Sequence, residues 1–138
     1  LDCGERDDIH PRDKRTVGYR LALTALENVY EQEITSSGPV YREMQIKDGR
    51  IVLYFDHTDG GLVLSEGSER LIGFQIAAAD GPYLTAEASI EGSAVVLWHP
   101  DITKPTKARY AWANYTEANL LNGRGLPAGT FRTLRENR

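Results

Sequence analysis

The sequence predicts a mainly β protein: an antiparallel β-sandwich of the Ig-like or jelly-roll type, preceded by a loop and one α-helix. Apolar residues follow a helical period only between Lys14 and Tyr30. The turn-forming stretch 35–39 ends this pattern, and the period changes to two in the rest of the chain. About seven short runs with turn signals between them are typical of a sandwich. We therefore expect two units, residues 1–34 and residues 35–138.

The predicted helix has one apolar face. Its apolar positions recur every three or four residues: Val17, Leu21, Ala22, Ala25, Leu26 and Val29. Pro11 suits the first turn, and Asp13 places a negative charge at the positive end of the helix dipole. The pattern predicts that this face is buried against another part of the protein.

The predicted strands begin with a hairpin. Val40–Lys47 and Arg50–Phe55 flank Asp48-Gly49, a dipeptide that favours a tight two-residue turn. Further runs of strand length follow between turn signals: Gly73–Ala78, Tyr83–Glu91, Ala94–Trp98 and Lys107–Ala113. Apolar and polar residues alternate along Tyr83–Glu91 and again along Lys107–Ala113, where Ala108, Tyr110 and Trp112 lie on one side. This alternation predicts one buried and one exposed face.

Composition excludes several classes of function. Hydrophobic residues make up 41% and charged residues 26% of the chain, which argues against disorder. A net charge of -4 with scattered Lys and Arg argues against a nucleic-acid partner. Cys3, a single cysteine, forms no internal disulfide and no metal framework. No apolar run approaches the roughly 18 residues of a membrane span, so we expect no membrane partner.

The segment Asp7-Asp8-Ile9-His10-Pro11 carries the most specific chemistry. A carboxylate three residues before a histidine can accept a hydrogen bond from imidazole Nδ1, leaving Nε2 free to take a proton from a serine. The spacing alone is also compatible with a helix-capping loop, in which the acids favour the helix dipole and His10 lies on the surface. The pattern therefore indicates either the base of an acyl-transfer site or a structural loop.

The short motifs in and after this segment resemble those of one enzyme family. Asp8-Ile9-His10-Pro11, Lys14, Val17-Gly18 and Arg20-Leu21-Ala22 resemble the histidine block of the SGNH/GDSL-type carbohydrate esterases, specifically the sialate O-acetylesterase group. The resemblance continues over nearly the whole chain in the words Gly38-Pro39-Val40-Tyr41, Gly60-Gly61-Leu62, Gly73-Phe74, Arg109-Tyr110-Ala111-Trp112, Asn119-Leu120, Asn122, Gly125-Leu126-Pro127 and Phe131-Arg132-Thr133.

The resemblance implies hydrolysis of acetyl esters on sugars, above all on sialic acid, by a serine, a histidine and an acid. His10 corresponds to the general base. The acid corresponds to Asp7 by the general SGNH spacing, or to Asp8 by the Asp-Ile-His-Pro motif of this group. We prefer Asp7, because one intervening turn lets its side chain fold back to the histidine. Residues 1–34 then correspond to the last loop and helix of the α/β SGNH domain, and residues 35–138 to a β-sandwich domain. No cofactor or metal is implied, and the family suggests a periplasmic or secreted protein.

The nucleophile of that family has no counterpart in this sequence. The serines lie in predicted turns or a strand, and none follows the pattern of a strand-to-helix elbow: Ser36, Ser37, Ser65, Ser68, Ser89 and Ser93. The chain also begins Leu1-Asp2-Cys3 without Met. We interpret it as a C-terminal fragment that is inactive alone, whose partners are the missing N-terminal SGNH domain and an acetylated sugar.

A binding module is the alternative function. Aromatic side chains can stack on sugar rings, and amides can bind their hydroxyl groups. The candidates are the aromatics Trp98, Tyr110, Trp112 and Tyr115 and the amides Asn114, Asn119 and Asn122. Aromatics that alternate along a strand also serve as core residues, so these positions favour either a sugar platform or a packed interior.

Overall fold

The computed structural model describes residues 2–133. One helix, α1 (Lys14–Asn28), precedes all the strands of this part of the chain. The strands are β1 (Val40–Lys47), β2 (Arg50–Asp56), β3 (Leu62–Leu64), β4 (Phe74–Ala77), β5 (Leu84–Thr85), β6 (Glu87–Glu91), β7 (Ala94–Trp98), β8 (Lys107–Tyr110), β9 (Leu120–Asn122) and β10 (Phe131–Arg132). The protein is mainly β, as the sequence predicted.

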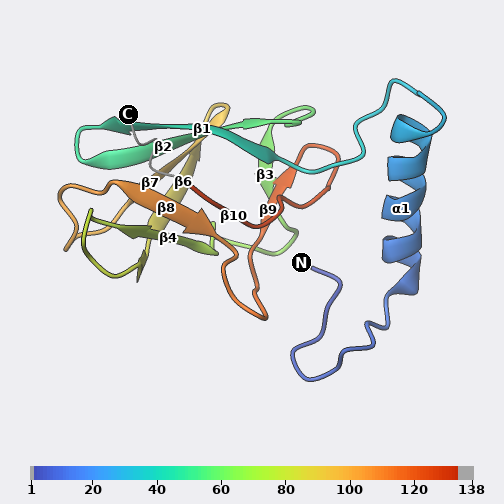
Figure 1. Ribbon diagram of the computed structural model, residues 1–138, viewed down its shortest axis with the longest axis horizontal. Helices are drawn as coiled ribbons and strands as arrows, with labels where there is room; N and C mark the ends of the chain where they lie inside the picture. The colour runs from blue at the N-terminus through green and yellow to red at the C-terminus, as the bar shows by residue number, and fades with distance from the viewer. Residues whose placement is uncertain (1, 134–138) are drawn as a thin grey trace.

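The strands form two four-stranded antiparallel sheets that face each other (Figure 1). One sheet has the order β1-β2-β7-β6 and the other β10-β8-β4-β5, with β3 and β9 as a separate pair. The predicted hairpin is confirmed, because β1 pairs with β2 up to Lys47 and Arg50 around the Asp48-Gly49 turn. Asp48 and Gly49 both have positive φ, 49° and 74°, as such a turn requires.

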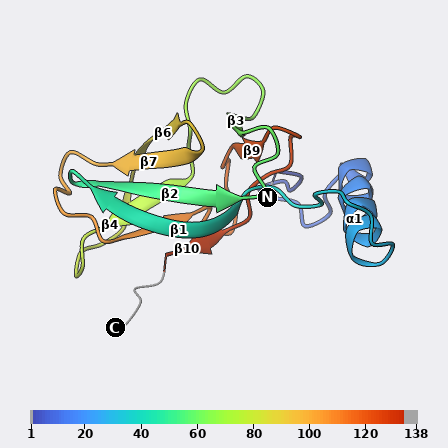
Figure 2. The same cartoon turned by 90° about the horizontal axis from the view of Figure 1, so that it is seen from above.

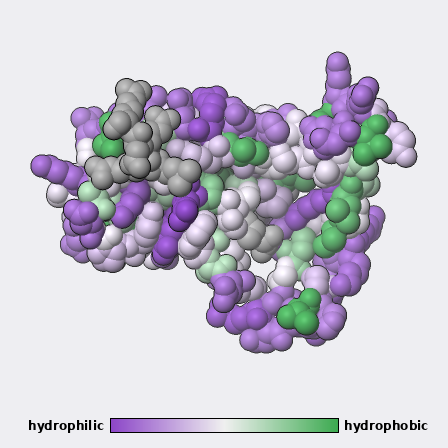
Figure 3. Space-filling view, viewed as in Figure 1, coloured by the Kyte–Doolittle hydropathy of each residue, from purple (hydrophilic) through white to green (hydrophobic). Residues whose placement is uncertain are grey.

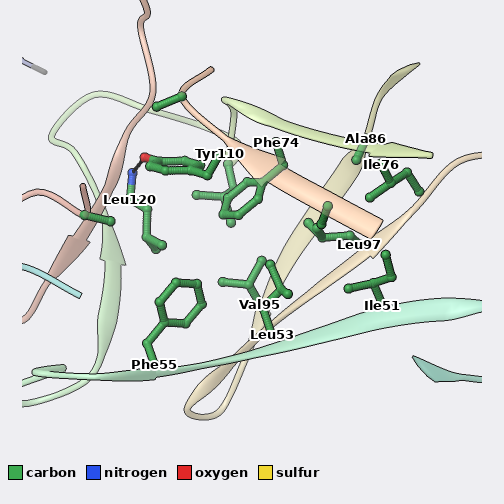
Figure 4. Packing of buried hydrophobic residues seen from close by; sticks show 14 of the residues in the cluster. Ile51, Leu53, Phe55, Phe74, Ile76, Ala86, Val95, Leu97, Tyr110 and Leu120 are labelled. Carbon is green, nitrogen blue, oxygen red and sulfur yellow. Dashed lines mark hydrogen bonds between the residues drawn. The ribbon is translucent and has the colours of Figure 1, made fainter. Parts of the chain in front are cut away.

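The core lies between the two sheets. Ile51, Leu53 and Phe55 alternate along β2 and point toward Phe74 and Ile76 of the opposite sheet (Figure 4). Each of these side chains is at most 5% exposed. Burying one such side chain stabilises a fold by about 1.5–3 kcal/mol, so this alternation accounts for the layered arrangement.

Two predicted strands differ from the structure in an informative way. The run Tyr83–Glu91 divides at Ala86, because β5 pairs with β4 in one sheet and β6 pairs with β7 in the other. The chain thus crosses between the sheets at Ala86, which is a corner of the sandwich. The run Lys107–Ala113 ends at Tyr110, because Ala111 has a φ of 51° and leaves the strand conformation.

Helix α1 lies beside the sandwich rather than on it (Figures 1 and 2). It begins at Lys14, where the Asp13 side chain accepts a hydrogen bond from the Thr16 backbone N–H at 3.0 Å, and ends at Asn28, two residues before the predicted end. Hydrogen bonding to Thr16, through its side chain first and its backbone N–H second, lowers the pKa of Asp13.

The prediction that the apolar face of α1 is buried is wrong for this structure. Val17, Leu21 and Val29 are 37%, 67% and 71% exposed, and the helix buries Leu23 instead. Hydrophobic atoms accordingly lie open along the helix in Figure 3. The side turned inward carries Arg20 and Glu27, and the Glu27 carboxylate accepts a hydrogen bond from the Ser36 hydroxyl. The contacts of Arg20 with Asp2 and of Glu27 with Ser36 thus tie the helix to the segments before and after it.

The buried amide of Asn122 joins three loops beside the β3–β9 pair. Its Nδ2 donates to the backbone carbonyls of Ser37 at 3.2 Å and His57 at 3.0 Å. Its Oδ1 accepts from the backbone N–H groups of Arg124 and Leu126 at 3.1 and 3.0 Å. Asn122 is fully buried, so these four hydrogen bonds satisfy the whole amide. The segment that links α1 to β1 is fastened to the sandwich at this point.

No helix among residues 2–133 is long and apolar enough to cross a lipid bilayer.

Candidate functional site

The loop that carries His10 is anchored at its start by an ion pair with α1. Both terminal nitrogens of Arg20 donate to the two carboxylate oxygens of Asp2, each at 2.6 Å. This two-point pairing fixes the guanidinium plane as well as the charge. The Arg20 contact is the main cause that lowers the pKa of Asp2 to about 2. Residues 4–12 therefore form a loop held at both ends by α1.

The Asp2–Arg20 pair predicts a pH-dependent contribution to stability. Because the folded-state pKa of Asp2 lies below its ordinary value of 3.8, the pair stabilises the fold above pH 4 and loses this effect as pH falls toward 2. The side chains are 34% and 25% exposed, so we expect only about 1 kcal/mol from it. Urea unfolding of Asp2→Asn should show this loss at pH 6 and a smaller one at pH 2.5. A loss of equal size at both pH values would contradict the assignment, and Asp80→Asn is the control.

His10 lies next to Asp8 in this loop. The Asp8 Oδ1 atom accepts a hydrogen bond from the His10 backbone N–H at 2.8 Å and lies 3.4 Å from imidazole Nδ1. This is the side of the imidazole on which an orienting acid acts, so Nε2 remains available for proton transfer. The His10 side chain is 81% exposed. The imidazole thus has a carboxylate near Nδ1 and is open to solvent on its other sides.

Asp7 is exposed in the turn before Asp8. Among residues 2–133 no contact joins its carboxylate to His10, whereas Asp8 makes two. Of the two candidate carboxylates, Asp8 is therefore the one that lies beside the His10 imidazole, whereas the sequence preference was Asp7. Asp7 and Asp8 both line a surface depression of about 420 Å³ with Glu5, Arg6 and Arg12.

A second histidine, His57, lies next to a serine. The Ser37 hydroxyl lies 2.5 Å from His57 Nδ1. Within the described residues no carboxylate contacts the His57 imidazole, and the neighbouring Asp56 is paired with Arg42 at 3.1 Å. Because α1 precedes every strand in residues 2–133, no serine there lies on a strand-to-helix elbow. The Ser37–His57 contact therefore lacks the remaining parts of a hydrolytic site.

Some residues of the predicted sugar platform lie in the protein interior and others lie on its surface. Tyr110 is 1% exposed, and its hydroxyl accepts a hydrogen bond from the Leu120 backbone N–H at 2.9 Å (Figure 4). Burial raises the pKa of Tyr110 to about 12. Asn119 is also internal, because its amide binds the backbone of Arg70 and Ile72. With Asn122 fully bonded, Tyr110 and these two amides belong to the interior, and their predicted contact with sugar is wrong.

Trp112, in contrast, is 48% exposed. It lies on the loop between β8 and β9, which descends beside the N-terminal loop in Figure 1. In the same loop the Tyr115 ring lies under the Arg6 guanidinium, 4.9 Å from the ring centroid. A cation over an aromatic face is attractive by about 0.5–1 kcal/mol at exposed sites. This contact links the Trp112 loop to the His10 loop, and no sequence signal predicted the pairing of Arg6 with Tyr115.

No group of three or more His, Cys, Asp and Glu side chains placed to hold a metal ion occurs within residues 2–133.

Comparison with known proteins relates the chain to a solved enzyme structure. No protein-family model matches the sequence. No curated protein matches it either. A solved structure described as a novel carbohydrate acetylesterase from Xanthomonas citri is 38% identical, with a TM-score of 0.89. The match covers 96% of this chain but 31% of that protein. Nearly the whole chain is thus similar in sequence and structure to about a third of a carbohydrate acetylesterase.

Proposed function

We propose that this chain is the C-terminal part of a carbohydrate O-acetylesterase and supplies that enzyme's general base, His10. The observation that carries the proposal is the 38% identity to a carbohydrate acetylesterase over 96% of the chain. At that coverage the match spans both the sandwich and the helical part. The 3.4 Å distance between Asp8 Oδ1 and His10 Nδ1 supports the proposal, because an orienting acid acts on this side of the imidazole.

In the proposed mechanism, His10 Nε2 takes the proton from a serine hydroxyl of the preceding N-terminal SGNH domain. The serine oxygen attacks the acetyl carbonyl, and His10 then gives this proton to the departing sugar oxygen. Water, deprotonated by the same imidazole, releases acetate from the acyl-enzyme and restores the serine. The carboxylate of Asp8 stabilises the imidazolium formed in each step. No step requires a metal or cofactor.

The missing domain would also cover two exposed features. The His10 imidazole is open to solvent, and the apolar face of α1 around Leu21 and Val29 has no cover among the described residues. An SGNH domain packed against α1 would bury this face and enclose Nε2. We propose that the chain is one part of a longer enzyme, because its site is incomplete, and that the chain alone has no esterase activity.

The carboxylate that orients His10 can be identified by substitution in the longer polypeptide. We expect Asp8→Asn to lower kcat by about 10²–10⁴-fold, because the amide cannot stabilise an imidazolium. Asp7→Asn is the matched control and should stay within about threefold. Rates of acetate release give both values. A large loss in Asp7→Asn with normal turnover in Asp8→Asn would reverse the assignment.

Sialic acid is the substrate we propose within this class, on the sequence words shared with the sialate O-acetylesterase group. The function is tested by acetate release from 9-O-acetylated sialic acid and from acetylated neutral oligosaccharides. The longer polypeptide should hydrolyse at least one of them, whereas the 138-residue chain should hydrolyse none. Absence of hydrolysis by the longer polypeptide on every acetylated sugar would refute the proposal.

A non-catalytic sugar-binding or interaction module is the second candidate. The observation that favours it is the exposed Trp112 ring, which lies beside two surface depressions. The two functions are compatible, because a binding surface on the sandwich can serve an esterase that acts on the same sugar chain.

A further inference from the structure

We infer that the outer face of the β10-β8-β4-β5 sheet, together with Trp112, is a binding site for a carboxylate-bearing sugar unit. The inference takes only the class of ligand, a sugar, from the proposed function. It concerns a second set of residues, away from His10 and Asp8, and it can be tested by binding without any turnover.

The aromatic part of this site is the Trp112 ring. Trp112 borders two adjoining depressions of about 320 and 220 Å³. The first reaches the lower limit of ligand sites, roughly 300 Å³. It is lined with the polar side chains of Asn114 and Thr130, and the second with those of Gln75, Thr85 and Thr116. An exposed ring between polar walls suits a sugar, which has apolar C–H faces and a rim of hydroxyl groups.

A row of polar side chains extends this surface across the sheet. The strand registers place Arg132 opposite Arg109, Arg109 opposite Gln75, and Gln75 opposite Thr85. Four neighbouring strands thus contribute one side chain each to a continuous line. Arg109 Nε donates to Gln75 Oε1 at 2.7 Å, and its guanidinium lies over the Tyr83 ring at 4.1 Å.

The two arginines give the site its preference for a negative charge. Arg132 lies over the Trp112 ring, 5.6 Å from the centroid, and Arg109 lies next to it in the row. Neither guanidinium forms an ion pair with a carboxylate of residues 2–133, whereas Arg20 and Arg42 do. Two guanidinium groups that have no carboxylate partner among residues 2–133 lie beside an exposed indole, and they can bind a carboxylate while the sugar ring contacts the aromatic face.

The position of the site relates it to the His10 loop. Trp112 and Tyr115 lie three residues apart in one loop, and Tyr115 contacts Arg6. Arg6 belongs to the segment that presents Asp8 and His10. A sugar unit held at Trp112 would therefore be a non-reacting part of a longer chain that approaches the ester-cleaving site.

The chain contains two tryptophans, which allows a direct binding test. In the Trp98→Phe variant Trp112 is the remaining tryptophan, so its fluorescence reports on this site alone. We expect a saturable change on titration with galacturonic acid and at least about tenfold weaker binding of galactose, which lacks the carboxylate. Arg132→Gln in this background should weaken binding of galacturonic acid about tenfold, and Trp112→Phe in the natural background should abolish the signal.

The matched control is the pair of Arg50 and Trp98, which has the same cation–aromatic contact at 5.1 Å on the other sheet. Arg50→Gln should leave the titration unchanged. The inference is overturned if galacturonic acid and galactose bind equally, if neither binds, or if Arg132→Gln has no effect. Acetate release by the longer polypeptide is measured separately, so loss of this site and failure of the esterase proposal give different results.

Discussion

Replacing His10 by Ala in the longer polypeptide is expected to lower kcat/KM for an acetylated sugar by about 10³–10⁶-fold. Without the imidazole, the serine proton has no acceptor and the leaving sugar oxygen has no donor, so both halves of acyl transfer slow. KM should change little, because the proposed role of His10 is proton transfer and not substrate binding. Steady-state acetate release measures both parameters.

His99→Ala is the matched control for this experiment. His99 Nδ1 accepts a hydrogen bond from the Asp101 backbone N–H at 3.1 Å in the turn after β7, and this contact concerns local structure alone. Its removal should leave turnover within about threefold. Near-normal kcat/KM in His10→Ala would contradict the assignment of the base, and an equal loss in both variants would show a general loss of structure.

Replacing Asn122 by Ala is expected to destabilise the sandwich by about 3–4 kcal/mol. The change removes four hydrogen bonds and leaves the carbonyls of Ser37 and His57 and the N–H groups of Arg124 and Leu126 without this partner. A buried polar group left without a partner costs about 1–3 kcal/mol. The free energy of unfolding from urea titration of the chain gives the value.

Asn114→Ala is the control for Asn122, because Asn114 is exposed and takes no part in the four hydrogen bonds of the Asn122 amide. Its effect on unfolding should stay within about 0.5 kcal/mol. If Asn122→Ala were as stable as Asn114→Ala, the three loops would be held together by other contacts, and the structural role of this amide would be refuted.

The sandwich could be predicted from the sequence because its signals are local. The Asp48-Gly49 turn predicted the hairpin of β1 and β2, and alternation along Lys107–Ala113 predicted that Ala108 and Tyr110 share the buried face. The short strand β10 had no such signal, since Phe131–Arg132 has no length over which to alternate. Phe131 is instead placed by packing, 4.8 Å from the Tyr41 ring across a large separation in sequence.

The burial of α1 could not be predicted in the same way. A helical period shows which face is apolar, but not which part of a protein covers that face. In this structure Arg20 and Leu23 face inward while Leu21 is exposed. The start of the helix at Lys14 was predicted correctly, because Asp13 is a local signal next to it. The end had no comparable signal, and the helix stops at Asn28, two residues before the predicted Tyr30.

The candidate site was predictable in its residue types and less so in its geometry. The motif Asp8-Ile9-His10-Pro11 identified the histidine, but its spacing did not decide between the carboxylates of Asp7 and Asp8. Only the folded loop places Asp8 Oδ1 beside Nδ1 of His10. Trp112 was assigned to the same strand face as Tyr110. The positive φ of Ala111 separates the two residues, so that Tyr110 enters the core and Trp112 remains exposed.

If His10 activates a serine of the same polypeptide, the rate at which a fluorophosphonate labels that serine depends on His10. This reagent needs a deprotonated serine but no sugar recognition, so it isolates the action of the base. In the longer polypeptide, we predict that His10→Ala slows labelling by at least about a hundredfold, while Trp112→Ala and His99→Ala label at the natural rate. Labelling of His10→Ala at the natural rate would show that His10 is not the base that activates the serine.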